Sequence, residues 1–253
     1  METGLDPEAS HEAVRNVVVL APMPMEMDAI VKAFGLTPTS GEPQAPCVGL
    51  MGRSRVRCTH IGMGPTLTRR ALITMFDEAD ASDDPVHHVM VAGICGGLDP
   101  EIPVGTLLNP ELIVEHARGT EYRHRPPGDA PRQGKLVTTD EATLDLDLSK
   151  QLLSDGFLGV DMESSAVAEI CEQRGCAWSV YRCIGDRWVD GLLDERIVAA
   201  TNQDGSGNMA ELERLLSEDP ALAGRLERLA RETSHAARLA AEAAVRGCLA
   251  LDG

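Results

Sequence analysis

The stretch GVDMESSAVA, residues 159–168, places two carboxylates between an apolar strand and a helix. The preceding Leu158-Gly-Val160 predicts a buried strand, and the small residues after Glu163 predict the start of a helix. A carboxylate here would cap the first turn of that helix well. The carboxyl end of a strand in an open α/β sheet is also where ligands bind. These ten residues therefore leave two interpretations open, a helix cap or a ligand contact.

Apolar runs on both sides of this stretch predict further strands. They lie at residues 17–21, 56–61, 86–92, 136–139 and 178–184, and residues 107–114 are extended. Helical patterns occupy residues 26–34 and 66–76, and residues 209–250 are helical throughout, divided at Pro220. Residues 119–134, rich in Pro, Arg and Gly, predict a loop.

Strands that alternate with helices indicate an α/β protein. We predict a single-domain three-layer sandwich with a mixed, mainly parallel central sheet, spanning residues 1–253. A polar N-terminal tail covers residues 1–16, and a helical C-terminal extension, residues 208–250, packs on the outside of the sandwich.

The composition limits the classes of partner. Acidic residues outnumber basic ones 40 to 23, for a formal net charge of −17, which opposes nonspecific binding to nucleic acid or an anionic membrane surface. The seven cysteines form no regular framework and no CxxC or HExxH motif occurs, so we expect reduced cysteines and no metal site. The polar N-terminus and the lack of a long apolar stretch predict a cytoplasmic protein.

A glycine-rich turn, Gly62-Met-Gly64, follows a predicted strand and opens a helix. The dinucleotide fingerprint GxGxxG fails because Leu67 stands where the third glycine belongs, and no GxxxxGK[ST] motif occurs. We therefore expect no nicotinamide and no other cofactor.

Three carboxylates lie at predicted strand-to-loop junctions: Glu26, Glu163 and Asp186. The turn Gly93–Gly97 ends another strand, where the backbone can approach a ligand closely. Because the carboxyl ends of parallel strands meet at one edge of a sheet, we expect these groups to lie together. Each carboxylate alone could be a helix cap or a turn former, but three at one edge favour a ligand site.

Five motifs follow one another along the chain: Ala21-Pro-Met-Pro-Met-Glu26, Gly62-Met-Gly64, Gly93-Ile-Cys-Gly-Gly-Leu98, Val160-Asp-Met-Glu163 and Ile184-Gly-Asp186. In this order they resemble the nucleoside phosphorylase/nucleosidase superfamily. By motif, residues 17–200 are most similar to the methylthioadenosine/S-adenosylhomocysteine nucleosidases, and the chain from Gly205 onward resembles hopanoid-associated nucleoside phosphorylases. The resemblance implies a nucleoside substrate and a homodimer or higher homo-oligomer.

The resemblance also implies the role of each site residue. Asp186 matches the aspartate that protonates the leaving purine at N7, and Glu26 matches the carboxylate that activates water in the nucleosidases. Glu163 matches the glutamate that binds the ribose hydroxyls, and Met162 the residue that packs on the sugar. Two further positions, Gly96 and Thr143, match those whose backbone contacts the ligand.

The chain departs from the family pattern in the base and sugar region. Ile94 and Gly185 stand where serine is usual, and Ala142 stands where an aromatic residue stacks on the purine. Trp188 is the candidate to replace that ring. These changes leave the identity of the substrate open.

Water and phosphate remain alternative nucleophiles. An arginine that precedes the glycine-rich turn in hexameric phosphorylases is Val91 here, and no arginine lies in 21–26. The loop arginines could supply a phosphate site: Arg118, Arg123, Arg125 and Arg132. Because Glu26 is present, we predict a purine nucleoside hydrolase acting on an adenosine-type nucleoside, with or without a 5′ modification. The alternatives are a phosphate-dependent purine nucleoside phosphorylase and a catalytically weak nucleoside-binding protein.

Overall fold

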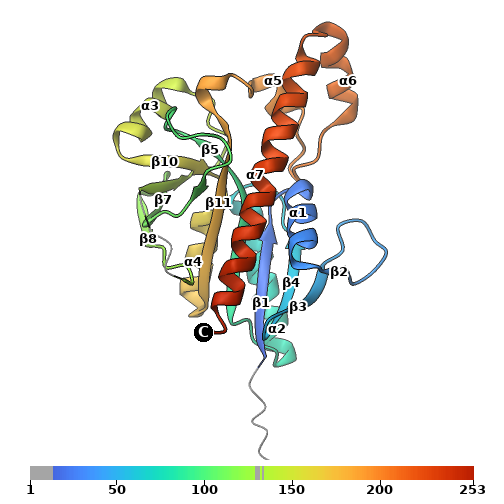
Figure 1. Ribbon diagram of the computed structural model, residues 1–253, viewed down its shortest axis with the longest axis vertical. Helices are drawn as coiled ribbons and strands as arrows, with labels where there is room; N and C mark the ends of the chain where they lie inside the picture. Colours follow the sequence, from blue (N-terminus) through green and yellow to red (C-terminus); the bar gives the residue numbers. More distant parts are fainter. Residues whose placement is uncertain (1–13, 129–131, 133) are drawn as a thin grey trace, which may run out of the picture.

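The structure is a computed structural model that describes residues 14–128, 132 and 134–253 (Figure 1). Most of the predicted polar tail lies outside the described residues. The strands are β1 Arg15–Ala21, β2 Thr37–Pro38, β3 Cys47–Met51, β4 Ser54–His60, β5 His88–Gly97, β6 Leu107–Leu108, β7 Leu112–Glu115, β8 Thr120–Arg123, β9 Lys135–Thr138, β10 Phe157–Asp161 and β11 Ala177–Arg187. The helices are α1 Pro24–Phe34, α2 Pro65–Ser82, α3 Leu146–Ser154, α4 Ser164–Arg174, α5 Glu195–Ala199, α6 Met209–Glu218 and α7 Leu222–Ala250, with a short 3₁₀ helix, η1, at Trp188–Asp190.

A mixed, mainly parallel sheet forms the middle layer, as predicted. Its order is β2-β3-β4-β1-β5-β10-β9-β7-β8, and β11 pairs with both β5 and β6. Strands β4, β1, β5 and β11 are mutually parallel where they pair. A second parallel set, β10, β9 and β7, joins the first through β10, which runs antiparallel to the end of β5.

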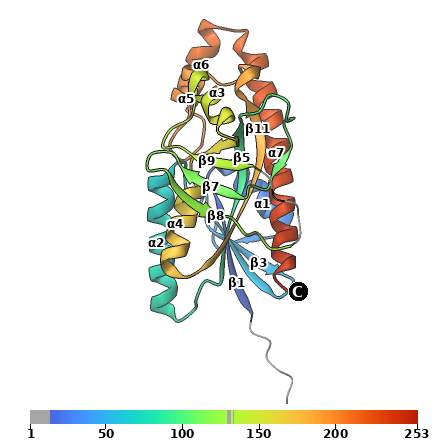
Figure 2. The same ribbon diagram turned by 90° about the vertical axis from the view of Figure 1, so that its left-hand side faces the viewer.

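Helices cover both faces of the sheet (Figures 1 and 2). In β1, Val18 and Leu20 pack on the side that carries α2 and α4, whereas Val17 and Val19 pack on the side that carries α1 and α7. Both alternating sets are buried, which explains why this strand reads as a continuous apolar run. The three-layer α/β sandwich is therefore confirmed.

Helix α7 differs from its prediction as an outer extension, because it forms part of a layer. It runs beside α1 and along β5 and β11 (Figure 1). Its inward face consists of small residues that let helix and sheet approach closely: Ala236, Ala237, Ala240, Ala241, Ala243, Ala244, Gly247 and Cys248. The predicted break at Pro220 is confirmed, since α6 ends at Glu218 and α7 begins at Leu222.

Some short elements were not predicted. The predicted loop 119–134 contains β8, which pairs with β7, and residues 146–154 form α3. The start of α3 could have been predicted from Asp145, a residue type that favours the N-cap position. Its side chain caps the helix by accepting hydrogen bonds from the backbone N–H groups of Asp147 and Leu148. All seven cysteines are free thiols, and six of them are buried, as expected for reduced core residues.

The contact between α7 and β11 generates the first prediction. A Cβ at Gly247 would overlap the hydroxyl of Tyr181. Gly247→Ala should therefore lower the free energy of unfolding by about 1–2 kcal/mol, because overpacking costs more than the roughly 1 kcal/mol that alanine gains over glycine in a helix. Urea unfolding followed by circular dichroism measures this change.

Gly224 is the matched control on the same helix, since a Cβ there meets nothing within 4 Å. Gly224→Ala should leave stability unchanged or raise it by up to about 1 kcal/mol. Equal stability of Gly247→Ala and the wild type would contradict the close packing of α7 on β11.

Candidate active site

One cavity of about 190 Å³ brings together all six residues that the sequence predicted for the site. They are Glu26, Gly96, Thr143, Met162, Glu163 and Asp186. Glu26 lies in the first turn of α1, and Asp186 lies near the end of β11. Glu163 follows β10, which enters from the opposite direction, with Val160 paired to Gly96 of β5. The prediction that parallel strand ends bring all three carboxylates together was therefore wrong for Glu163; the antiparallel crossing does so.

Glu26 is buried and held by two backbone donors. It accepts hydrogen bonds from the backbone N–H of Ile94 at 2.7 Å and of Met23 at 2.8 Å. The bond from Met23 is a capping contact at the start of α1. Burial raises the pKa of Glu26 to about 7, and the nearby Arg182 opposes the rise. Glu26 is therefore both a cap and a carboxylate able to take up a proton near neutral pH.

Of the two carboxylates in the stretch 159–168, one is a helix cap and the other is free of that role. Asp161 is the cap, because it accepts hydrogen bonds from the backbone N–H of Ser164 at 3.2 Å and from the Ser164 hydroxyl. Glu163 occupies the N-cap position but makes no capping bond there. Its side chain instead accepts hydrogen bonds from the Gly64 N–H and from Arg182, both at 2.7 Å.

Arg182, which the sequence analysis missed, lies at the centre of this group. It is fully buried in β11. Its Nε donates to Asp161 Oδ2 at 2.8 Å and its Nη2 to Glu163 Oε2 at 2.7 Å, while Nη1 lies 3.7 Å from Glu26 Oε1. The sequence did contain one indication of this group, an arginine inside the apolar run 178–184. A charge buried in a strand requires partners of opposite charge nearby.

Gly93 allows this arrangement. It pairs with Arg182 across β5 and β11, and a Cβ there would overlap the carboxylate of Glu26 and lie 2.8 Å from Arg182 Nη1. The predicted turn Gly93–Gly97 is in fact the second half of β5, and its first glycine makes room for the charged groups.

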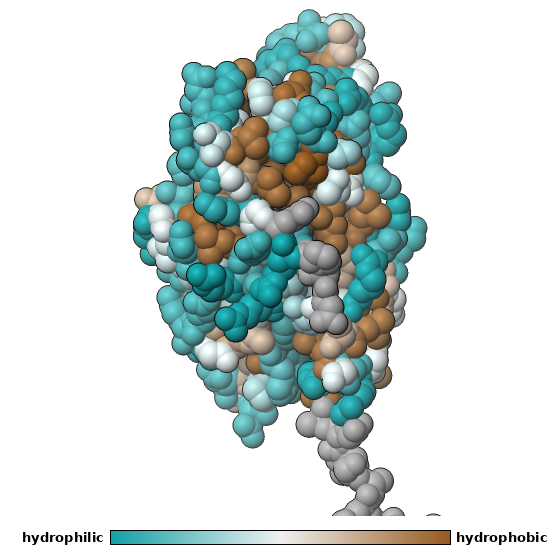
Figure 3. Space-filling view, turned by 60° about the vertical axis from the view of Figure 1, so that its left-hand side comes forward, coloured by the Kyte–Doolittle hydropathy of each residue, from teal (hydrophilic) through white to brown (hydrophobic). Residues whose placement is uncertain are grey.

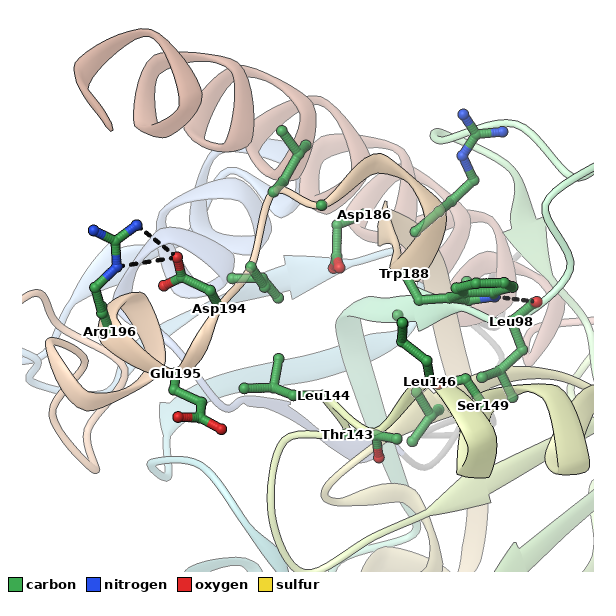
Figure 4. A pocket seen from close by; sticks show the side chains of 17 residues that line it. Leu98, Thr143, Leu144, Leu146, Ser149, Asp186, Trp188, Asp194, Glu195 and Arg196 are labelled. Atoms are coloured by element: carbon green, nitrogen blue, oxygen red, sulfur yellow. Dashed lines mark hydrogen bonds and ion pairs between the residues drawn. The ribbon is translucent and has the colours of Figure 1, made fainter. Parts of the chain in front are cut away.

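Asp186 presents a carboxylate to the open space (Figure 4). Among the described residues, none forms a hydrogen bond or an ion pair with this carboxylate. Burial raises its pKa to about 6, and the neighbouring carboxylates of Asp190 and Glu232 add to the rise. Asp186 can therefore hold a proton close to neutral pH and donate it to a bound molecule.

Two of the departures from the family pattern form one packing unit. A Cβ at Gly185 would lie 3.0 Å from the Cβ of Ile94, so Ile94 fills space beside Gly185. Ala142 lines the cavity, and Trp188 does not. The indole of Trp188 lines an adjoining pocket, where its N–H donates to the carbonyl of Leu98 at 2.8 Å (Figure 4).

The loop arginines considered for phosphate lie elsewhere. Arg118 pairs with Glu115 and Glu169, and Arg132 donates to the carbonyl of His124. None of the four loop arginines is among the described residues that line the cavity.

The comparisons with known proteins agree with this fold. The model of the phosphorylase superfamily matches residues 16–156, more than half of the chain, and the chain belongs to that family. No curated protein matches the chain significantly in sequence.

Several solved structures share the fold at low sequence identity. The 5′-methylthioadenosine/S-adenosylhomocysteine nucleosidase of Helicobacter pylori aligns with a TM-score of 0.65 and 15% identity, covering 96% of this chain and all of that one. The enzyme from Neisseria meningitidis aligns with a TM-score of 0.67 and 14% identity, covering 93% and 99% of the two chains. Futalosine hydrolase of Helicobacter pylori aligns with a TM-score of 0.63 and 16% identity, covering 94% and 98%.

No helix in the described part of the chain has the length and apolar character needed to cross a bilayer. Among the same residues, no group of three or more His, Cys, Asp and Glu side chains is arranged to hold a metal ion.

The buried arginine generates the second prediction. Arg182→Met should lower the free energy of unfolding at pH 8 by about 3–5 kcal/mol, because it leaves buried carboxylates without their cation. The loss should be smaller at pH 5. Burial already raises the pKa values of Glu26 and Glu163, and without the cation they rise further above those of the unfolded chain. The folded variant then binds extra protons and loses stability as the pH rises.

The matched control is Arg214→Met, which removes a half-exposed arginine from its surface pairs with Glu211 and Glu218. It should change stability by less than about 1 kcal/mol at either pH. Thermal and urea unfolding at pH 5 and pH 8 compare the two variants. An Arg182→Met variant as stable as Arg214→Met at pH 8 would contradict the central role of Arg182.

Proposed function

We propose that this protein is a purine nucleoside N-ribosyl hydrolase that cleaves the N-glycosidic bond of an adenosine-type nucleoside. The observation that carries the proposal is the pairing, in one cavity, of two carboxylates with pKa values of about 7 and about 6, Glu26 and Asp186. Breaking this bond requires an acid for the leaving base and a base for the attacking water. The nucleosidase structures that share the fold support the same reading.

In this mechanism Asp186, in its protonated form, donates a proton to N7 of the purine. Electrons of the glycosidic bond move into the base, and positive charge develops on the ribose ring. Glu26 accepts a proton from the water that attacks C1′. The products are the free purine and the free sugar, and both carboxylates return to their starting states by exchanging protons with water.

Glu163 holds the sugar. One of its oxygens accepts from the Gly64 N–H and the other from Arg182, and each oxygen retains acceptor capacity for a ribose hydroxyl. Met162 supplies an apolar contact for the sugar, and Gly96 and Thr143 line the cavity. Burial raises the pKa of Glu163, against the effect of Arg182, so the arginine keeps this group available as an acceptor.

A phosphorylase is the second candidate, favoured by the family and by Arg182. Although residues 21–26 contain no arginine, Arg182 supplies a cation, since its Nη1 lies 3.7 Å from Glu26 Oε1. However, the guanidinium of Arg182 already faces three carboxylates. A phosphate beside Glu26 would add further negative charge to this buried cluster, in which carboxylates outnumber the cation. Water is therefore the favoured nucleophile. A weak nucleoside-binding protein is the third candidate, favoured by Ala142 and Ile94. The homo-oligomeric state of the protein stays a prediction.

The third prediction tests the chemistry through Asp186. Asp186→Asn should reduce purine release from adenosine or 5′-methylthioadenosine by about 10²–10⁴-fold, because an amide cannot donate the proton. Binding, measured by a thermal shift with the same nucleosides, should persist. The control is Asp147→Asn on the exposed face of α3, which should release purine at the wild-type rate.

The wild-type rate should also pass through a maximum between pH 6 and 7. It rises as Glu26, with a pKa of about 7, loses its proton and falls as Asp186, with a pKa of about 6, loses its own. Glu26→Gln should be slower and should lose the rise on the acidic side. Binding without purine release by the wild type would favour the binding protein instead.

A further inference from the structure

A second pocket of about 570 Å³ opens directly beside the catalytic cavity (Figure 4). The two share part of their walls, including Gly96, Thr143 and Asp186. The second pocket does not include Glu26, Glu163 or Met162 among the described residues that line it. Its boundary with the cavity therefore lies at the base end of a bound nucleoside, and the sugar end is elsewhere.

Much of the wall of the second pocket is apolar. Leucines from three segments line it: Leu98 directly after β5, Leu144 and Leu146 at the start of α3, and Leu192 and Leu193 after η1. The indole of Trp188 adds an aromatic surface, and its only polar atom is already bonded to the carbonyl of Leu98. Figure 3 shows the face that carries α3, where apolar side chains gather in the upper half among hydrophilic ones.

Three of the five charged side chains that line this pocket have partners, whereas the carboxylates of Asp186 and Glu195 form no hydrogen bond or ion pair with other described residues. Asp194 accepts from Arg196 and from Arg225 of α7, and Arg187 donates to Asp190 and to the carbonyl of Pro100. Because the two unpaired groups are both carboxylates, the pocket disfavours an anionic substituent, and its leucines suit an apolar one.

The chemistry of adenine fixes which part of a substrate reaches this pocket. N7 and the 6-amino group lie on the same edge of the ring, so a carboxylate that protonates N7 lies beside whatever the 6-amino group carries. Asp186 lines both spaces. A substituent on the 6-amino nitrogen would pass Asp186 and enter the apolar pocket, while the sugar remains beside Glu163.

We infer that the preferred substrate is an N6-substituted adenine nucleoside whose substituent is apolar. This inference rests on the proposed function, because it assumes that Asp186 protonates N7. The leucine-lined pocket binds the substituent, and Asp186 stands at its entrance.

The test compares kcat/KM for adenosine with that for N6-benzyladenosine, and for 5′-methylthioadenosine with that for its N6-benzyl derivative. In at least one of the two series, the benzyl compound should exceed its parent by about tenfold or more, since burying an apolar group gives discrimination of this order. Leu146→Glu, which places a charge on the half-exposed wall of the pocket, should reduce this ratio about tenfold.

Leu50→Glu is the matched control, because Leu50 is an exposed leucine on β3 that does not line the pocket. It should leave the ratio unchanged. Purine release from the parent nucleosides with little or none from the benzyl compounds would overturn this inference and leave the proposed function standing. Release from none of the four compounds would overturn both.

Discussion

The site depends on one buried guanidinium. Arg182 lies in the middle of β11, where water cannot solvate it, and its charge is compensated by the carboxylates of Asp161, Glu163 and Glu26. Such a group is stable only when all of its members are in place, because removing one partner leaves another buried charge unpaired. Three segments far apart in the sequence, the first turn of α1, the end of β10 and the centre of β11, are therefore tied to one point. The fold therefore positions these charged side chains, and their mutual pairing in turn fixes the three segments relative to one another.

The same group bears on the chemistry that we propose. Three carboxylates share one cation, so the buried charge is negative when all of them are ionised. An environment of this sign favours a transition state with positive charge on the sugar and disfavours a second anion as the nucleophile. Arg182 also opposes the rise in the pKa of Glu26 that burial causes. It acts as a positioning residue through the carboxylates.

Much of the fold was predictable from the sequence, because apolar runs and strand ends are local signals. The six site positions, taken from the carboxylate pattern and the family resemblance, line one cavity, and their roles stay predictions. Arg182 was not recognised, since its partners come from other segments and only the arginine itself, within 178–184, marked the place. The antiparallel entry of β10 was also missed, because strand direction in a sheet is set by tertiary pairing. Helix α7 was expected outside the sandwich, yet its alanine-rich face belongs to a layer of it. The sequence alone did not show that Ile94 fills the space beside Gly185, since the two residues meet only across β5 and β11.

The nature of the nucleophile tests the account most directly. The wild-type protein would be given adenosine or 5′-methylthioadenosine, with and without inorganic phosphate, and the sugar product would be identified by ¹H and ³¹P magnetic resonance. We predict release of the free sugar in both buffers, at rates that phosphate does not raise. A strict requirement for phosphate, with a ribose 1-phosphate as the product, would contradict the account, since a phosphate would then have to bind beside a group of buried carboxylates that share only Arg182.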